Sequence, residues 1–154
     1  MPQQQNNIGY TKALTVLFTA LFAGQIIFAV LAFTLVSTGS VSNNAPELEN
    51  IFFILVPVLI ITGRLGGTAI FKNKIQQALS AGTVNEKLSI YRGAFITRCA
   101  LIEGGVLFAV ITYLLTNKIE LLAFAAGGLI LFYMLKPTKE RIASELQIPE
   151  SSID

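Results

Sequence analysis

The stretch GAFITRCALIEGGVLFAVITYLL, residues 93–115, decides how this chain folds. At 1.5 Å per residue, a helix of this length crosses the roughly 30 Å hydrocarbon core of a bilayer. Its one acidic residue, Glu103, would then lie near the middle of the membrane. An ionised, unpaired carboxylate at that depth costs about 2.5–3.5 kcal/mol on insertion scales, so Glu103 needs a proton, a cation or a charged partner.

The whole chain has the composition of a membrane protein. Of its 154 residues, 53% are hydrophobic and 13% are charged, whereas a typical soluble domain carries about 25% charged residues. Four long apolar runs account for the difference: 13–36, 51–71, 93–115 and 121–135. The first three are long enough to span a bilayer, and the fourth needs flanking residues or a locally thinner membrane. The sequence therefore predicts an all-α fold, a four-helix transmembrane bundle.

The first run is expected to stay in the protein as a helix. It is much longer than the apolar core of about 7–15 residues that is typical of a signal peptide, and only Lys12 forms its basic flank. The chain then divides into a four-span transmembrane domain, 1–136, and a short cytoplasmic amphipathic tail, 137–154.

Lysine and arginine indicate the orientation of the predicted bundle. The connection 37–50 contains acidic residues and no basic residue. Basic residues gather instead before the first run, between the second and third runs, and after the fourth: Lys12; Lys72, Lys74, Lys87 and Arg92; Lys136, Lys139 and Arg141. Because basic segments stay on the cytoplasmic side, both termini are predicted to be cytoplasmic. The expected location is the plasma (inner) membrane, as a multi-pass protein.

Two local patterns predict helix ends outside the membrane. Thr83 and Glu86 have the spacing of a capping box, so the third helix is expected to start near Val84. Pro137 should interrupt the fourth helix, and Ile142 and Leu146 then share one face of a short amphipathic helix.

The first and third runs resemble one another in sequence. Residues 20–31 read ALFAGQIIFAVL and residues 100–111 read ALIEGGVLFAVI. The match suggests two helical hairpins related by duplication, an arrangement known in transporters. Chance agreement between apolar segments is the alternative.

Four polar side chains are expected at membrane depth. From the helical rise, Glu103 lies about 16 Å beyond Arg92, Arg64 about 12 Å before Lys72, and Gln25 about 20 Å beyond Lys12. A fourth residue, Arg98, lies about 9 Å in, where its long side chain can reach the headgroups.

Two interpretations of these polar residues stay open. In one, the chain is a non-transporting structural or assembly subunit. Arg64 and Glu103 then form a static ion pair that fixes the second helix against the third, with a hydrogen bond from Gln25. In the other, Glu103 binds or relays a proton or cation, and its pKa is adjusted by Arg64, Gln25 and Arg98. Burial favours the neutral carboxyl and a nearby arginine favours the charged form, so the distance to Arg64 decides between them.

Small residues predict where the helices touch. Gly63 and Gly67 have the GxxxG spacing, and glycine or alanine pairs recur at 104–105 and 125–128. Such residues let backbones approach closely, within one chain or between copies of it.

Residues 91–103, YRGAFITRCALIE, resemble the acid-bearing helix of the proteolipid (c) subunits of rotary ATP synthases and V-type ATPases. The resemblance covers the second and third runs only. It implies that Glu103 is a proton- or sodium-carrying carboxylate, that Arg92 is the basic residue at the loop, and that this loop faces the cytoplasm.

The sequence predicts a small integral membrane protein that works in a homo-oligomer or with other membrane subunits. The expected partner of its surface is the lipid bilayer. The chain has no histidine and no nucleophile beside a base, so we expect no enzyme, no catalytic residue, no cofactor and no metal site. A nucleic-acid partner is not expected either.

Overall fold

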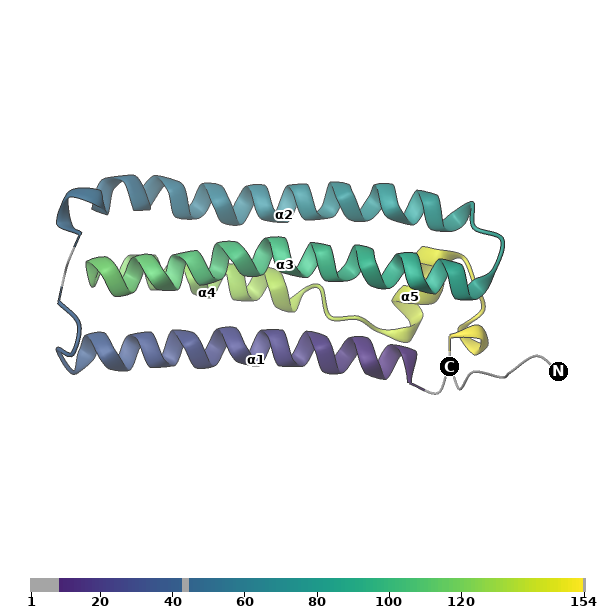
Figure 1. The fold of residues 1–154 in the computed structure, drawn as a ribbon, viewed down its shortest axis with the longest axis horizontal. Coiled ribbons are helices and arrows are strands. Elements are labelled where there is room, and N and C mark those ends of the chain that lie inside the picture. Colours follow the sequence, from purple (N-terminus) through teal and green to yellow (C-terminus); the bar gives the residue numbers. More distant parts are fainter. Residues whose placement is uncertain (1–8, 43–44, 154) are drawn as a thin grey trace.

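The computed structural model describes residues 9–42 and 45–153; residues 1–8, 43–44 and 154 of the predicted domains lie outside it. Every regular element of the described residues is helical, which confirms the all-α class. The elements are α1 (Tyr10–Ser37), η1 (Pro46–Leu48), α2 (Glu49–Leu79), α3 (Val84–Thr116), α4 (Ile119–Tyr133), α5 (Lys139–Leu146) and η2 (Glu150–Ser152) (Figure 1).

The helix ends follow the local patterns of the sequence. The Thr83 hydroxyl accepts a hydrogen bond from the Glu86 amide at 3.3 Å, and α3 begins at Val84 as predicted. The Thr138 hydroxyl does the same for the Arg141 amide at 3.3 Å, one residue before α5. Each bond satisfies an amide that the first helical turn leaves without a partner.

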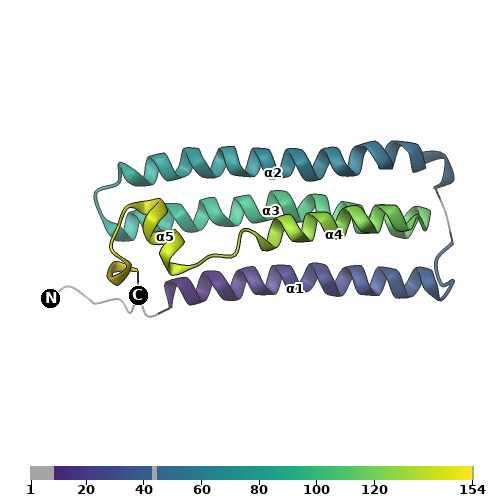
Figure 2. The ribbon, with the colours of Figure 1, turned by 180° about the vertical axis from the view of Figure 1, so that it is seen from behind.

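Helix α3 lies at the centre of the molecule. Figures 1 and 2, which view opposite sides, both show it between α1 and α2, with α4 covering one of its faces. Since α1 and α2 lie on opposite sides of α3, they do not form a hairpin like that of α3 and α4. The lengths differ as well, because α2 has 31 residues and α4 has 15. The sequence repeat is therefore not visible as two similar hairpins.

Small residues bring α2 and α3 close together. A Cβ at Gly63 would collide with the carbonyl oxygen of Leu101, and one at Gly67 would lie 3.3 Å from the carbonyl oxygen of Arg98. On the opposite helix, a Cβ at Gly105 would lie 3.1 Å from the Cα of Ile60. The predicted role of these glycines in packing within the chain is thus confirmed, and it sets the register of α2 against α3.

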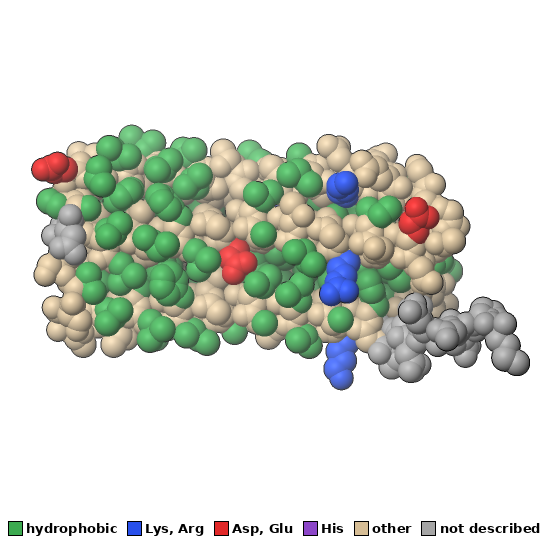
Figure 3. Space-filling view, viewed as in Figure 1, with side chains coloured by type: hydrophobic (Ala, Val, Ile, Leu, Met, Phe, Trp, Pro, Cys, Tyr) green, Lys and Arg blue, Asp and Glu red, His purple; other side chains and the backbone are tan. Residues whose placement is uncertain are grey.

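Three helices are long and apolar enough to cross a membrane: α1, α2 together with η1, and α3. Half of the most apolar window of α3 is buried inside the chain, but only 17% of the corresponding windows of α1 and α2. Large side chains such as Ile54 and Leu65 are 69% and 65% exposed. Figure 3 shows hydrophobic side chains over most of one long face, with basic side chains in the half nearer α5. So much exposed apolar surface is typical of contact with lipid.

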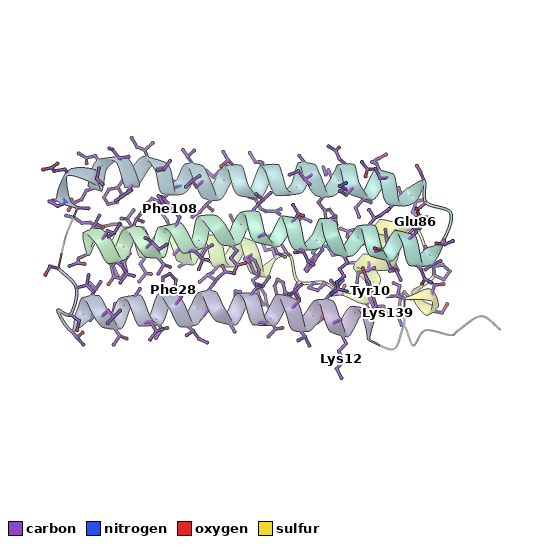
Figure 4. The ribbon with its side chains drawn as sticks, in the orientation of Figure 1. Tyr10, Lys12, Phe28, Glu86, Phe108 and Lys139 are labelled. Carbon is purple, nitrogen blue, oxygen red and sulfur yellow. The ribbon has the colours of Figure 1, made fainter. Side chains whose placement is uncertain are left out.

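Polar contacts fix both ends of the molecule. At the end where α1 starts, the Tyr10 hydroxyl donates to the Leu88 carbonyl oxygen at 2.6 Å, and Figure 4 shows Lys12 pointing away from the other helices. At the opposite end, Lys118 and Glu49 form an ion pair at 3.1 Å.

The tail packs onto the protein. Ile142, Leu146 and Ile153 are all 0% exposed, and the Tyr91 hydroxyl of α3 donates to the Glu145 carboxylate at 2.8 Å. Burial of these three apolar side chains against the ends of the long helices explains the ordered η2 turn after α5.

Candidate functional site

Glu103 lies in the middle of the apolar part of α3. It is partly buried, and its neighbour Ile102 is 0% exposed, whereas Gly104 on its other side is exposed. Within 9–42 and 45–153, the Glu103 carboxylate makes no ion pair and no hydrogen bond. The structure therefore places an acidic group at the expected position on the helix, without the predicted partners.

Gln25 is buried in α1, with 1% of its surface exposed. Its Nε2 donates to the Leu21 carbonyl oxygen at 3.3 Å, one turn earlier in the same helix. Its Oε1 is buried and has no hydrogen-bond partner among the residues that the structure describes. A buried carbonyl without a donor costs about 1–3 kcal/mol, so this amide oxygen is an open acceptor inside the protein.

Arg64 does not reach Glu103 in the structure. Its Nη1 donates to the Thr68 hydroxyl at 2.7 Å, and that hydroxyl donates to the Arg64 carbonyl oxygen at 2.8 Å. The glycine contacts place Arg64 level with residues 98–101 of α3, and its side chain runs along α2 toward Thr68, away from Glu103. The predicted Arg64–Glu103 ion pair is absent between these two described residues. The register of α2 against α3 and the direction of the Arg64 side chain keep the two charges apart.

Arg98 lies against α2 with only 8% of its surface exposed. Its guanidinium carbon is 4.9 Å from the centre of the Phe71 ring, and its Nη2 donates to the Thr68 hydroxyl at 3.4 Å. A side chain on a helix leans toward the N-terminus of that helix, so Arg98 points toward the end where α5 lies. Its placement beside Phe71 is a cation–π contact, which partly compensates the loss of water around the charge.

The structure thus separates the predicted site into two parts. Arg64 and Arg98 meet at one hydroxyl, Thr68, which sequence reasoning missed. Thr68 lies four residues after Arg64, and residues at that spacing are neighbours on one face of a helix. This spacing is the local signal that could have indicated the contact between them. Glu103 lies apart from this pair and makes no hydrogen bond to Gln25 within the described part of the chain.

Comparison of the chain with protein-family models, with curated proteins and with solved structures finds no match.

Proposed function

We propose that this chain is a small multi-pass membrane protein in which Glu103 binds or relays a proton or a cation within the bilayer. The observation that carries the proposal is the position of Glu103, ten residues after Gly93 and twelve before Leu115, without a compensating partner in the described chain. A carboxylate left ionised there would be costly, and binding a proton or a cation removes that cost. The resemblance of residues 91–103 to a proteolipid helix points to the same chemistry.

The surroundings of Glu103 favour an oligomer or a complex with other membrane subunits. Ala100 and Gly104, on the same side of α3, are exposed, and a Cβ at Gly104 would meet no atom within 4 Å. Figures 1 and 2 show α4 along one face of α3 only, and Glu103 itself is partly exposed. Small exposed residues beside an acid leave room for a helix of another subunit.

We also propose that the chain crosses the plasma (inner) membrane four times, with both termini in the cytoplasm. Helix α4 has 15 residues, about 22 Å of helix, and the irregular residues 134–138 continue it toward α5 (Figure 1). Helix α4 and residues 134–138 together form a fourth segment that is longer than α4 alone and closer to the length needed to cross the membrane.

An assembly role through a static Arg64–Glu103 pair is the competing function. The described residues do not make the contact on which it depends, because Arg64 bonds to Thr68. We therefore place proton or cation binding first.

Infrared difference spectroscopy of the purified chain in lipid nanodiscs tests the proposal. We expect a protonated-carboxyl band, or a band that shifts with added Na⁺, which disappears in Glu103→Gln. Glu120→Gln is the matched control, because Glu120 is exposed at the start of α4 and its replacement should leave the band. A spectrum in which Glu103 stays an ionised carboxylate at every pH and is insensitive to Na⁺ would contradict the proposal.

A further inference from the structure

A basic pocket lies between α2, α3 and α5, at the end of the molecule where α1 starts. Its volume is about 430 Å³. The lining residues are Thr68, Phe71, Lys72, Ile75, Gln76, Arg98, Arg141 and Glu145. Three of these side chains are cationic and one is anionic, so the lining carries an excess of positive charge.

The most buried cation of this pocket has no counter-ion. Arg98 is 8% exposed, and it makes no ion pair within 9–42 and 45–153. Its Nε is buried and has no hydrogen-bond partner, so part of its donor fork is unused. Burying a guanidinium without a carboxylate is unfavourable unless an anion compensates the charge.

The one carboxylate of the pocket is already engaged. Glu145 Oε1 lies 3.4 Å from Arg141 Nε, and Glu145 Oε2 accepts the hydrogen bond of the Tyr91 hydroxyl at 2.8 Å. Arg141 also donates from Nη1 to the Met134 carbonyl oxygen at 3.1 Å. These contacts hold Arg141 at the pocket while Glu145 can balance only one of the positive charges.

A second open pocket, of about 450 Å³, shares two residues with the first. Thr68 and Lys72 line both, and Arg64 lines only the second. Since Arg64 and Arg98 both donate to the Thr68 hydroxyl, two guanidinium groups lie within hydrogen-bond distance of one oxygen atom. Two like charges this close repel each other, and an anion between the helices would remove the repulsion.

We infer that this basic pocket binds a phosphate group, from the headgroup of an anionic phospholipid or from a soluble phosphate. Arginine forks match the oxygens of phosphate, and lysine adds a point charge. Basic pockets between membrane helices are known to take anionic lipid headgroups. The inference does not depend on the role of Glu103.

Lipid binding to the full chain in detergent micelles tests the inference. Native mass spectrometry measures retention of phosphatidylglycerol against phosphatidylcholine with the same acyl chains, and thermal unfolding is followed with each lipid. We expect preferential retention of phosphatidylglycerol and a higher Tm in its presence. Arg98→Gln should weaken this binding about tenfold, as for the loss of a charged hydrogen bond. Lys72→Gln should weaken it about fivefold.

Arg92→Gln is the matched control. It removes one positive charge from the exposed side of the same helix, outside both pockets, and should leave lipid retention unchanged. Should Arg98→Gln fail to fold, the double variant Lys72→Gln and Arg141→Gln provides the same test, because Lys72 is exposed and Arg141 is only partly buried.

A parallel titration with inorganic phosphate, at constant ionic strength, distinguishes the two sources. Stabilisation by phosphate in the absence of anionic lipid identifies a soluble ligand, and stabilisation by phosphatidylglycerol alone identifies a headgroup. Equal retention of both lipids with no effect of phosphate would overturn the inference. The same holds if Arg92→Gln reduces binding as much as the pocket variants do.

Discussion

Arg64 and Thr68 form a closed pair on α2: the arginine donates to the threonine hydroxyl at 2.7 Å, and the hydroxyl donates to the arginine carbonyl oxygen at 2.8 Å. This local pair holds the guanidinium one turn nearer to α5 than its own Cα. Because α2 and α3 are antiparallel, the same turn takes it farther from Glu103. The direction of one side chain thus decides which charges of the membrane segment interact.

Arg64→Gln and Glu103→Gln should have additive effects on stability. The two side chains make no direct contact in the described structure, so the coupling energy in a double-mutant cycle should stay within about 0.5 kcal/mol. Unfolding in mixed micelles with increasing denaturing detergent gives the four free energies. A coupling energy above about 1 kcal/mol would instead support the interpretation of Arg64 and Glu103 as a static ion pair.

A lipid-soluble carbodiimide should modify Glu103 in a pH-dependent way. The reagent attacks the protonated carboxyl, so labelling should be strongest at low pH and decline as the pH rises and the group ionises. Mass spectrometry of the peptide that contains residue 103 measures it. Glu103→Gln should abolish the label, and Na⁺ should reduce it if the carboxylate holds that cation. The idea of a proton-binding acid fails if residue 103 stays unlabelled at every pH.

Gly63→Ala should destabilise the protein, whereas Gly66→Ala should not. An alanine Cβ at position 63 would collide with the Leu101 carbonyl oxygen, and overpacking of this kind costs about 1–3 kcal/mol. At position 66 a Cβ meets nothing within 4 Å, and alanine favours the helix by about 0.5–1 kcal/mol. Thermal unfolding in one detergent compares the two variants. Equal shifts in Tm would show that α2 and α3 do not approach at Gly63.

Tyr91→Phe should loosen α5. The substitution keeps the buried ring and removes the hydrogen bond to the Glu145 carboxylate, which is worth about 1.5–3 kcal/mol for a charged acceptor. Amide hydrogen exchange in α5 should then be at least about tenfold faster. Tyr133→Phe is the control, because that side chain is 54% exposed. Unchanged exchange in α5 would mean that apolar burial alone holds the tail.

Cysteine labelling should reveal the orientation in the membrane. In a Cys99→Ala background, we expect an impermeant maleimide to label Ser42→Cys in intact cells, and Ser144→Cys only after permeabilisation. Both serines are exposed, on the first connection and on α5, so the pair is matched in chemistry. The opposite result would invert the proposed topology, and labelling of both sites in intact cells would argue against a spanning arrangement.

Local patterns predicted the long helices and α5, although α2 continues to Leu79, beyond the apolar run 51–71. The apolar run 93–115 and the Thr83 cap predicted α3, whose observed bounds are Val84–Thr116. The spacing of Ile142 and Leu146 predicted α5 and the face that they share, and the structure shows that this face is buried against the protein. These features depend on residues a few positions apart, through hydrogen bonding and helical periodicity, which is why the sequence contains them.

The pairing of the polar side chains could not be predicted in this way. From their expected depths in the membrane alone, Arg64 and Glu103 were predicted to form an ion pair. The register set by Gly63 and Gly67 brings Arg98 to Thr68 instead. The stacking of Arg98 on Phe71 joins residues of two helices, and no local spacing indicates it.

The sequence by itself determined that the chain is helical and apolar, that α3 starts at Val84, and that one acid lies midway along the third apolar run. Only the tertiary structure decided that α3 is the central helix, that two arginines share one hydroxyl, and that Glu103 has no partner in the described chain. The physical reason is the range of the forces involved: helix formation depends on neighbours along the chain, whereas a side-chain contact depends on how closely two helix backbones can approach.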